Sequence, residues 1–307
     1  MNTLSLIKTQ AHPQNPLLIG TGFAILSNVL FGVIYAYGKW LAPLSGTGVF
    51  LWRMLMMWVC LMCFLLLTGK FKSIISELQP MKASGWFWLV LPTPIFASQL
   101  WLFMYAPLHG LGVQVSMGYF LFPLAMVMAG CLSGEKLSPL QKLAVGLAVC
   151  GVVAEFMRLG ELGVASLWVC LTYPIYYILR KRQGIGALTG LFVDTTLIAP
   201  VCLWWLIAQD SISLWTVVGS TVLSLKVVGL GLISVLALQS NLQANRLLPS
   251  SLFGMLSYLE PALLFVIAIT LLGDAFSWSM LGSFGLIWLA IGCLLLQGIQ
   301  GLKTKLD

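Results

Sequence analysis

The sequence predicts an all-α polytopic membrane protein in which ten transmembrane helices form two inverted five-helix repeats. Three observations predict this fold: an apolar composition, an internal repeat, and basic residues gathered in alternate loops. Of the 307 residues, 60% are hydrophobic and only 8% are charged, whereas a soluble domain carries about 25% charged residues. Apolar runs of about 20 residues, long enough to cross the hydrocarbon core of a bilayer, follow one another along the chain.

The hydropathy pattern places each predicted helix between polar connections. The connections around 69–84 and 209–222 are the longest, and we expect both to lie partly at the membrane interface. The first apolar run follows a short polar segment without a small-residue cleavage pattern, so we interpret it as a retained helix and not as a signal peptide. The predicted spans are 17–38, 47–68, 85–107, 111–133, 139–157, 164–180, 187–208, 223–245, 250–272 and 277–299.

The second half of the chain repeats a motif of the first half. An aromatic residue, a proline, a glycine–acid pair and a further glycine recur in the same order, as Tyr119, Pro123, Gly134, Glu135 and Gly146 and then as Tyr258, Pro261, Gly273, Asp274 and Gly285. The spacing is 139 residues (258 − 119, 273 − 134 and 285 − 146), with the proline shifted by one.

Five helices in each half make the repeat inverted, because an odd number of crossings brings the second half into the membrane from the opposite side. A duplicated membrane unit of this kind is typical of secondary transporters. The predicted units are a cytoplasmic N-terminal tail (1–16), a first repeat (17–157), a second repeat (158–300) and a cytoplasmic C-terminal tail (301–307).

The basic residues are distributed unevenly between alternate loops. If the N-terminus is cytoplasmic, the outer side holds only Lys39, Arg158 and Lys226, while Arg53 lies within a span. The positive-inside rule therefore predicts that both termini are cytoplasmic, and the net charge of +7 reflects these loops and no nucleic-acid surface. The inner side holds Lys8, Lys70, Lys72, Lys82, Lys136, Lys142, Arg180, Lys181, Arg182, Arg246, Lys303 and Lys305.

Charged residues inside apolar runs are the first candidates for a functional site, because a charge at the bilayer centre costs at least about 2.5–3.5 kcal/mol on insertion scales. Glu260 lies near the middle of its span, directly before Pro261. Since proline cannot donate to the carbonyl one turn back, we expect a freed backbone acceptor beside the acid. Glu260 is interpreted as a cavity-facing acid that binds a proton or the substrate, or as a protonated acid hydrogen-bonded to a neighbouring helix.

Two further charges lie within predicted spans. We expect Asp194 either to share a cavity with Glu260 or to cap a local helix distortion. Arg53 is expected to snorkel to the interface, or to pair with a carboxylate or an anionic group of a substrate. Glu155 and Arg158, three residues apart at a helix end, are expected to form an exposed pair.

Neutral polar and aromatic residues within the spans extend the candidate site. Gln239 and Gln243 lie one turn apart, and Asn28 lies in the first span; such groups either join helices or line an aqueous path. Four aromatic residues are also candidates, because a tyrosine-lined cavity suits a flat amphipathic solute. These are Trp101 and Tyr105, one turn apart, and Tyr119 and Tyr258, which the repeat places at equivalent depths.

The repeated motif resembles the EamA family of the drug/metabolite transporter superfamily, and within it the chain is most similar to RarD-type permeases. Three segments carry the resemblance: 118–152, 176–182 and 257–276. The likeness extends over nearly the whole chain, from about Gly20 to Gly298. It implies a ten-helix inverted-repeat bundle in a bacterial inner membrane, with a central substrate cavity and export of metabolites or drugs as the usual activity.

The motif residues at the helix ends are expected to be structural. Glycine suits a helix C-terminus, and the acid that follows can cap the next helix, which fits Gly134 with Glu135 and Gly273 with Asp274. The chain departs from the family pattern at Asp274, where glutamate is usual, and at Asp194, where the family has a glutamate before the threonine. Both changes keep the charge on a shorter side chain.

We therefore expect a secondary-active exporter of small amphipathic metabolites or drugs that works by alternating access, with proton coupling through Glu260 and Asp194 as a hypothesis. A passive facilitator and a lipid or lipid-linked-sugar flippase stay as alternatives. An intramembrane enzyme is not expected, since both histidines, His12 and His109, fall outside the spans. The expected partners are a small-molecule substrate and the bilayer, with no nucleic acid, cofactor or metal; a monomer suffices for the fold, and a dimer is left open.

Overall fold

The computed structural model describes residues 16–106, 109–160, 163–267, 270 and 278–303, and the elements within these ranges are helices. The helices in chain order are α1 (Pro16–Tyr37), the short η1 (Gly38–Leu41), α2 (Gly46–Thr68), α3 (Phe71–Leu78), α4 (Ala83–Val90), α5 (Thr93–Tyr105), α6 (Gly112–Leu132), α7 (Pro139–Leu159), α8 (Val164–Arg182), α9 (Ala187–Ala208), α10 (Ser211–Val218), α11 (Thr221–Leu247), α12 (Ser250–Leu256), α13 (Leu259–Ile267) and α14 (Trp278–Lys303).

Seven helical segments in the described ranges are long and apolar enough to cross a membrane. They are Pro16–Tyr37, Gly46–Thr68, Ala83–Tyr105, Gln114–Leu132, Pro139–Arg158, Ala187–Ala208 and Thr221–Leu247. Large apolar side chains cover much of the outer surface, as expected where lipid is the solvent. The chain is therefore a multi-pass, all-helical membrane protein.

The two long connections of the sequence contain short helices. Residues 71–78 form α3, and residues 211–218 form α10, which begins where the Asp210 carboxylate accepts a hydrogen bond from the Ser213 N–H at 3.2 Å. The predicted span 85–107 is interrupted at Leu91 and Pro92, so that α4 and α5 are separate elements. Pro92 and Pro94 lack the N–H groups that a continuous helix would need there.

The predicted span 250–272 is also interrupted, at Ser257 and Tyr258, which separate α12 from α13. This break changes the role expected for Pro261. The carbonyl of Ser257, four residues earlier, accepts a hydrogen bond from the Glu260 N–H at 3.1 Å. The expectation of a freed acceptor beside Glu260 is therefore wrong, because Pro261 lies in the first turn of α13, where its missing N–H leaves no gap in the helix.

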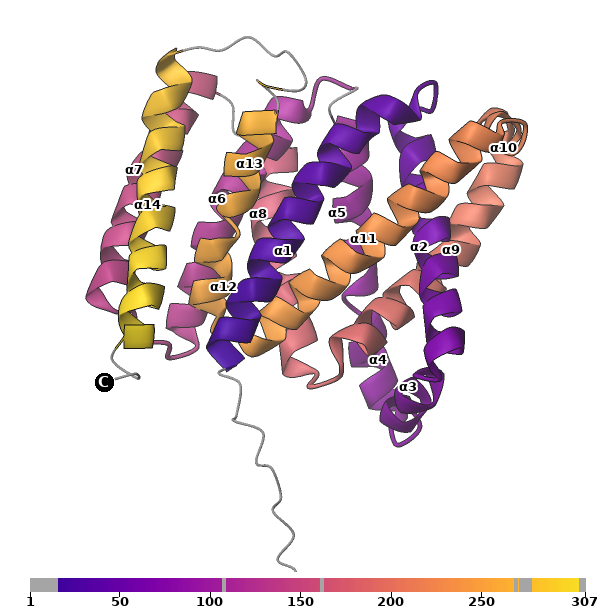
Figure 1. Ribbon diagram of the computed structural model, residues 1–307, viewed down its shortest axis with the longest axis horizontal. Helices are drawn as coiled ribbons and strands as arrows, with labels where there is room; N and C mark the ends of the chain where they lie inside the picture. The colour runs from indigo at the N-terminus through magenta and orange to yellow at the C-terminus, as the bar shows by residue number, and fades with distance from the viewer. Residues whose placement is uncertain (1–15, 107–108, 161–162, 268–269, 271–277, 304–307) are drawn as a thin grey trace, which may run out of the picture.

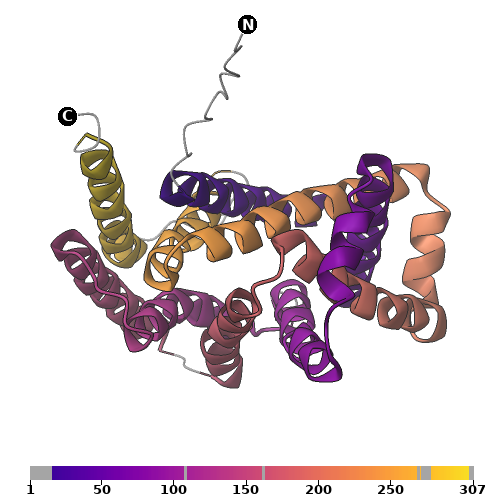
Figure 2. The ribbon, with the colours of Figure 1, turned by 90° about the horizontal axis from the view of Figure 1, so that it is seen from below.

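The helices form an elongated bundle. α1 and α11 lie along one side, and α6, α8 and α5 lie along the other (Figure 2). α7 packs against α14 at one end of the bundle, and α2 packs against α9 at the other. α1 begins and α14 ends on the same side of the bundle, the lower side in Figure 1.

Close helix packing depends on small residues, as is common between membrane helices. α12 approaches α6 at Gly254, where an added Cβ would lie 2.5 Å from the Met126 Cβ and 2.8 Å from the Pro123 carbonyl oxygen. Gly146 of α7 differs, since a Cβ there would meet no heavy atom within 4 Å. Pro123 lies inside α6, and its carbonyl oxygen is part of the surface that Gly254 of α12 approaches.

Candidate functional site

Asp194 lies at the centre of a buried hydrogen-bond network. Its side chain is fully enclosed, with 0% exposed, and it accepts hydrogen bonds from the Thr93 Oγ1 at 2.6 Å and the Tyr176 hydroxyl at 3.0 Å. It also forms an ion pair with the guanidinium of Arg180. The carboxylate of α9 thus joins α5 and α8, and each of its two oxygens has a partner.

Arg180 extends this network toward the end of the bundle. It also donates to the carbonyl of Leu89 at 3.0 Å and to the side chain of Gln183 at 2.8 Å. The sequence analysis counted Arg180 among the loop residues of the inner side. The loop assignment is wrong, because α8 continues to Arg182 and the Arg180 side chain is buried. A basic last turn suits the negative end of the helix dipole, which accounts for helix continuation through these residues.

A second polar junction holds the beginning of α12 at the same end of the bundle. The Glu135 carboxylate accepts hydrogen bonds from the backbone N–H groups of Ser250 at 2.7 Å and Ser251 at 2.8 Å. The Lys181 ammonium donates to the Leu248 carbonyl at 2.6 Å and to the Ser250 hydroxyl at 3.2 Å. Glu135 thus caps a helix start, but it caps α12 from a distant part of the chain and not the next helix, α7, which has its own cap at Ser138.

The hydrogen bonds that Glu135 accepts at the start of α12 also affect its pKa. Burial opposes ionisation of the carboxyl group, but hydrogen bonds from Ser251 and Ser250 and the charge of Lys181 outweigh that effect. The pKa of Glu135 is therefore held below its ordinary value of 4.5. At neutral pH the residue is a carboxylate at the N-terminus of α12.

Arg53 is the most deeply buried cation among the described residues, with 1% of its side chain exposed. Its Nε donates to the Ser234 hydroxyl of α11 at 2.9 Å. Its Nη1 has no hydrogen-bond partner among the described residues. The two ion pairs found in the described ranges are Glu155–Arg158 and Asp194–Arg180, and neither includes Arg53. The expectation that Arg53 snorkels to the interface is therefore wrong.

Two predicted candidates, Tyr119 and Glu260, lie near Arg53 together with Tyr173, which the sequence analysis did not select. Tyr119 of α6, Tyr173 of α8 and Glu260 of α13 lie close enough to the guanidinium to interact electrostatically with it. The Tyr119 and Tyr173 rings are in contact edge to face, with centroids 6.3 Å apart. We call these four residues the Arg53 cluster; it joins helices of both halves of the chain.

Trp101 and Tyr105 line a separate cavity of about 600 Å³ between α2, α5 and α9. Their rings are stacked with centroids 4.4 Å apart, and the Trp101 indole donates to the Thr47 hydroxyl at 3.3 Å. Thr93 also lines this cavity, and it is the residue that donates to Asp194. The described lining of this cavity includes neither Arg53, Glu260 nor Asp194.

The polar face of α11 differs from the face that the sequence suggested. Ser234, Asn241 and Asn245 are buried, and the Asn245 amide donates to the Tyr177 carbonyl at 2.9 Å. The predicted Gln239 and Gln243 are half-buried on a different face. Helical periodicity could have found this set, since 234, 241 and 245 share one side of a helix.

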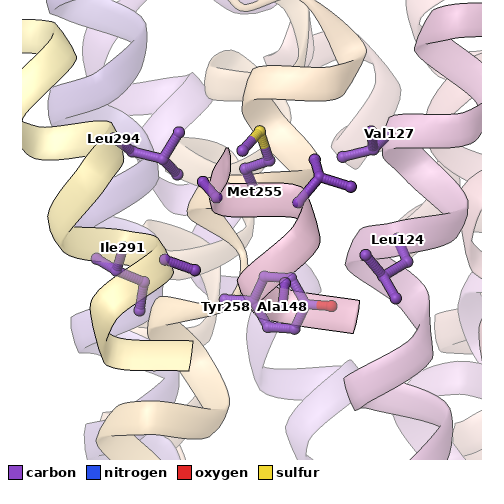
Figure 3. A pocket seen from close by; sticks show the side chains of 10 residues that line it. Leu124, Val127, Ala148, Met255, Tyr258, Ile291 and Leu294 are labelled. Atoms are coloured by element: carbon purple, nitrogen blue, oxygen red, sulfur yellow. The ribbon is translucent and has the colours of Figure 1, made fainter. Parts of the chain in front are cut away.

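Asn28 and Tyr258 make structural contacts. The Asn28 amide donates to the Ala24 carbonyl at 2.6 Å and to the Leu256 carbonyl at 3.4 Å, which joins α1 to α12. The Tyr258 hydroxyl donates to the Phe120 carbonyl at 3.1 Å. Its ring borders a tightly packed apolar pocket between α6, α7, α12 and α14 (Figure 3). Tyr258 therefore has different surroundings from Tyr119, although the repeat relates them.

Glu155 is buried, which corrects its assignment to an exposed pair. Only 2% of its side chain is exposed, and it accepts a hydrogen bond from Ser283 of α14 in addition to its pairing with Arg158. The partner is far away in sequence, so local spacing did not reveal it. Gly273 and Asp274, the second glycine–acid pair, lie outside the described residues.

Comparison with known proteins identifies relatives along almost the full chain, although no family model matches it. The chain is 40% identical to an uncharacterized transporter of Haemophilus influenzae, with 93% of this chain and 95% of that protein covered. It is 35% identical to the chloramphenicol-sensitive protein RarD of Pseudomonas aeruginosa, with 89% of this chain and 92% of that protein covered. The chain belongs to the RarD-type permeases.

This RarD-type permease shares its fold with a crystallised protein at a TM-score of 0.67 and 16% sequence identity, over 91% of this chain and 97% of the other. The names of its relatives identify the RarD-type permease as a membrane transporter, and the predicted resemblance to the RarD-type permeases of the drug/metabolite transporter superfamily is confirmed. None of these names assigns a role to the Arg53 cluster or to Asp194.

Proposed function

We propose that this permease is a secondary-active transporter of the bacterial inner membrane that exports small amphipathic metabolites by alternating access. The observation that carries the proposal is the Arg53 cluster, because buried ionisable groups within membrane helices mark substrate or ion pathways. The cluster joins α2 and α6 to α8 and α13, so a rearrangement between the two halves of the chain would change the surroundings of every member.

Contacts between helices support an inverted repeat of ten crossings, with α4–α5 and α12–α13 each forming one broken crossing and units at 17–157 and 158–300. A two-fold axis that exchanges two halves brings some elements against their own repeat mates. The packed pairs α2 with α9, α6 with α12, and α7 with α14 are such mates. Broken helices near the repeat interface are typical of secondary transporters.

The junctions at Asp194 and Glu135 would close the permease on the cytoplasmic side. The first junction joins Asp194 of α9 to Arg180 of α8, and the second joins Glu135 to the start of α12, which Lys181 of α8 also contacts. Both therefore involve the basic end of α8. A state open to the cytoplasm would need to separate these contacts, whereas the cavity between α2, α5 and α9 is lined by residues in the C-terminal half of α9, beyond Asp194. This arrangement fits a state with the cytoplasmic path closed and both termini cytoplasmic.

Coupling to protons would depend on Glu260, the carboxylic acid of the Arg53 cluster. The test begins with an untargeted comparison of extracellular metabolites between deletion and overexpressing strains, which identifies an exported solute. That solute is then followed in proteoliposomes with an imposed pH gradient. Wild-type protein should accumulate it against its gradient, and Glu260→Gln should abolish the gradient-driven flux.

Glu155→Gln is the matched control, because it removes another buried carboxylate at a site outside the Arg53 cluster. It should retain gradient-driven flux if the variant is monodisperse. Unchanged accumulation by Glu260→Gln would remove this acid from the coupling scheme. Flux by the wild type that only equalises concentrations would identify a passive facilitator.

A further inference from the structure

The two buried arginines of the permease differ in whether an anion balances their charge. Arg180 has a carboxylate, a carbonyl and an amide oxygen as partners, and Asp194 balances its charge, although its Nε finds no hydrogen-bond partner among the described residues. Arg53 is no more exposed, yet its only hydrogen bond to the part of the chain that the structure describes is to the neutral hydroxyl of Ser234. Protein interiors normally pair a buried guanidinium with an anion, so Arg53 lacks a partner that Arg180 has.

Glu260, the nearby acid, does not supply the anionic partner that Arg53 lacks. Glu260 interacts with Arg53 electrostatically, but the two form no ion pair. The Nη1 of Arg53 stays without a hydrogen bond. A guanidinium presents its N–H groups in a planar fork that matches the two oxygens of a carboxylate. The free part of the fork therefore suits an anion that arrives from outside the protein.

We propose that Arg53 binds the carboxylate group of an aromatic organic anion, which makes the substrate class of the proposed transporter anionic. The aromatic body would lie against Tyr119 and Tyr173, whose rings contact each other and lie near the guanidinium. Phe122 adds a third ring, 5.2 Å from Tyr173. Aromatic faces next to a charged anchor hold flat amphipathic solutes in this way.

A single negative charge fits this site better than a double one. Arg53 brings one positive charge, and Glu260 already brings an acidic group to its neighbourhood. A carboxylate adds about one negative charge, whereas a phosphate monoester adds about 1.5 to 2 near neutral pH. The second charge of a phosphate would face Glu260 without a cation to balance it.

The inference rests on the proposed transport function but has a binding test of its own. Purified full-length permease in detergent is heated with benzoate or with its neutral analogue benzamide, and then with a series of larger aryl carboxylates and their amides. Benzoate or a larger carboxylate should raise the unfolding midpoint at concentrations at least ~10-fold lower than the matching amide, a difference of about 1.4 kcal/mol in binding free energy.

Substitution at Arg53 should remove this preference. Arg53→Gln should respond to carboxylate and amide alike, and Arg53→Lys, which keeps the charge without the fork, should bind the carboxylate at least ~10-fold more weakly than the wild type. Arg158→Gln is the matched control, because that arginine pairs with Glu155 away from the cluster, and it should keep the preference. If Arg53→Gln does not fold, the comparison of carboxylates with amides on the wild type, together with Arg53→Lys, still tests whether Arg53 binds a carboxylate.

Three results would overturn the inference: equal responses of the wild type to carboxylates and amides, no response to any carboxylate, or an unchanged preference in Arg53→Gln or Arg53→Lys. Flux measurements separate this failure from failure of the proposed function. A neutral metabolite that is transported equally by wild type and Arg53→Gln would refute the anionic class while supporting transport. Absence of any exported solute would count against transport itself.

Discussion

The guanidinium of Arg180 pairs with the carboxylate of Asp194 inside the protein, where 4% and 0% of these side chains are exposed. Thr93 and Tyr176 supply further hydrogen bonds to the same carboxylate. The pair joins α8 to α9 across a loop, and Thr93 extends it to α5 and to the cavity lining. The chain thus places a buried ion pair beside a large cavity and, elsewhere in the bundle, an arginine that forms no ion pair with the described residues.

Replacement of Asp194 by Asn should strongly destabilise the protein. The change leaves Arg180 as an uncompensated buried charge, which typically costs about 3–5 kcal/mol. Thermal unfolding in detergent measures the effect. The double variant Asp194→Asn with Arg180→Gln should lose much less stability than the two single losses combined; additive losses would show that the residues act independently.

Replacement of Glu135 by Gln should weaken the anchoring of α12 in a pH-dependent way. Because the folded-state pKa of Glu135 is lowered, its stabilisation is fully present above the ordinary value of 4.5 and is lost as the pH falls through the lower folded-state value. The unfolding midpoint of the variant should therefore lie below that of the wild type at pH 7. The two proteins should converge in acid, and a difference that grows as the pH falls would contradict this account.

Addition of a methyl group at Gly254 should destabilise the contact between α12 and α6. The new Cβ would overlap Met126 and the Pro123 carbonyl, and overpacking of this kind costs about 1–3 kcal/mol. Gly146→Ala is the matched control, since its Cβ meets no neighbour and alanine favours a helix. Equal unfolding midpoints for the two variants would show that α12 shifts away from α6 at little cost.

The two tyrosines related by the repeat should differ in function. Tyr258→Phe removes a buried hydrogen bond to Phe120 and should cost about 0.5–1.5 kcal/mol of stability while leaving transport unchanged. Tyr119→Phe changes the Arg53 cluster and should reduce flux several-fold with little loss of stability. Loss of flux in Tyr258→Phe at unchanged stability would contradict this account. It would show that Tyr258 acts in transport, as its repeat mate Tyr119 is expected to do, and not only through its hydrogen bond to Phe120.

Hydropathy alone predicted most helix positions, because a bilayer-crossing helix must be both long and apolar. The bounds of α1, α2, α6 and α9 lie within a few residues of the predicted spans. The breaks near Pro92 and Ser257 were not predicted, since prolines inside membrane helices are often tolerated without interruption. Pro174 and Pro200 show this tolerance here, as α8 and α9 continue through them.

The candidate site was predictable only in part. Sequence identified Arg53, Glu260 and Asp194 because charges are rare in apolar runs, but it gave no information on which of them meet. Arg180 was assigned to a loop because it borders other basic residues, and its burial depends on Asp194 of the next helix. Glu155 was assigned to the surface because its contact with Ser283 joins residues far apart in the chain.

The interruption at Ser257 and Tyr258 divides one predicted crossing into two rods. The start of α12 is held by Glu135. If α12 and α13 formed one continuous helix, any tilt at that start would move Glu260 as well. Between α12 and α13 the backbone bonds shorten to three-residue steps, from Tyr258 to Met255 and from Glu260 to Ser257. A change in the tilt of α12 therefore need not be passed in full to Glu260, because the break separates the anchored helix from the helix that carries the acid.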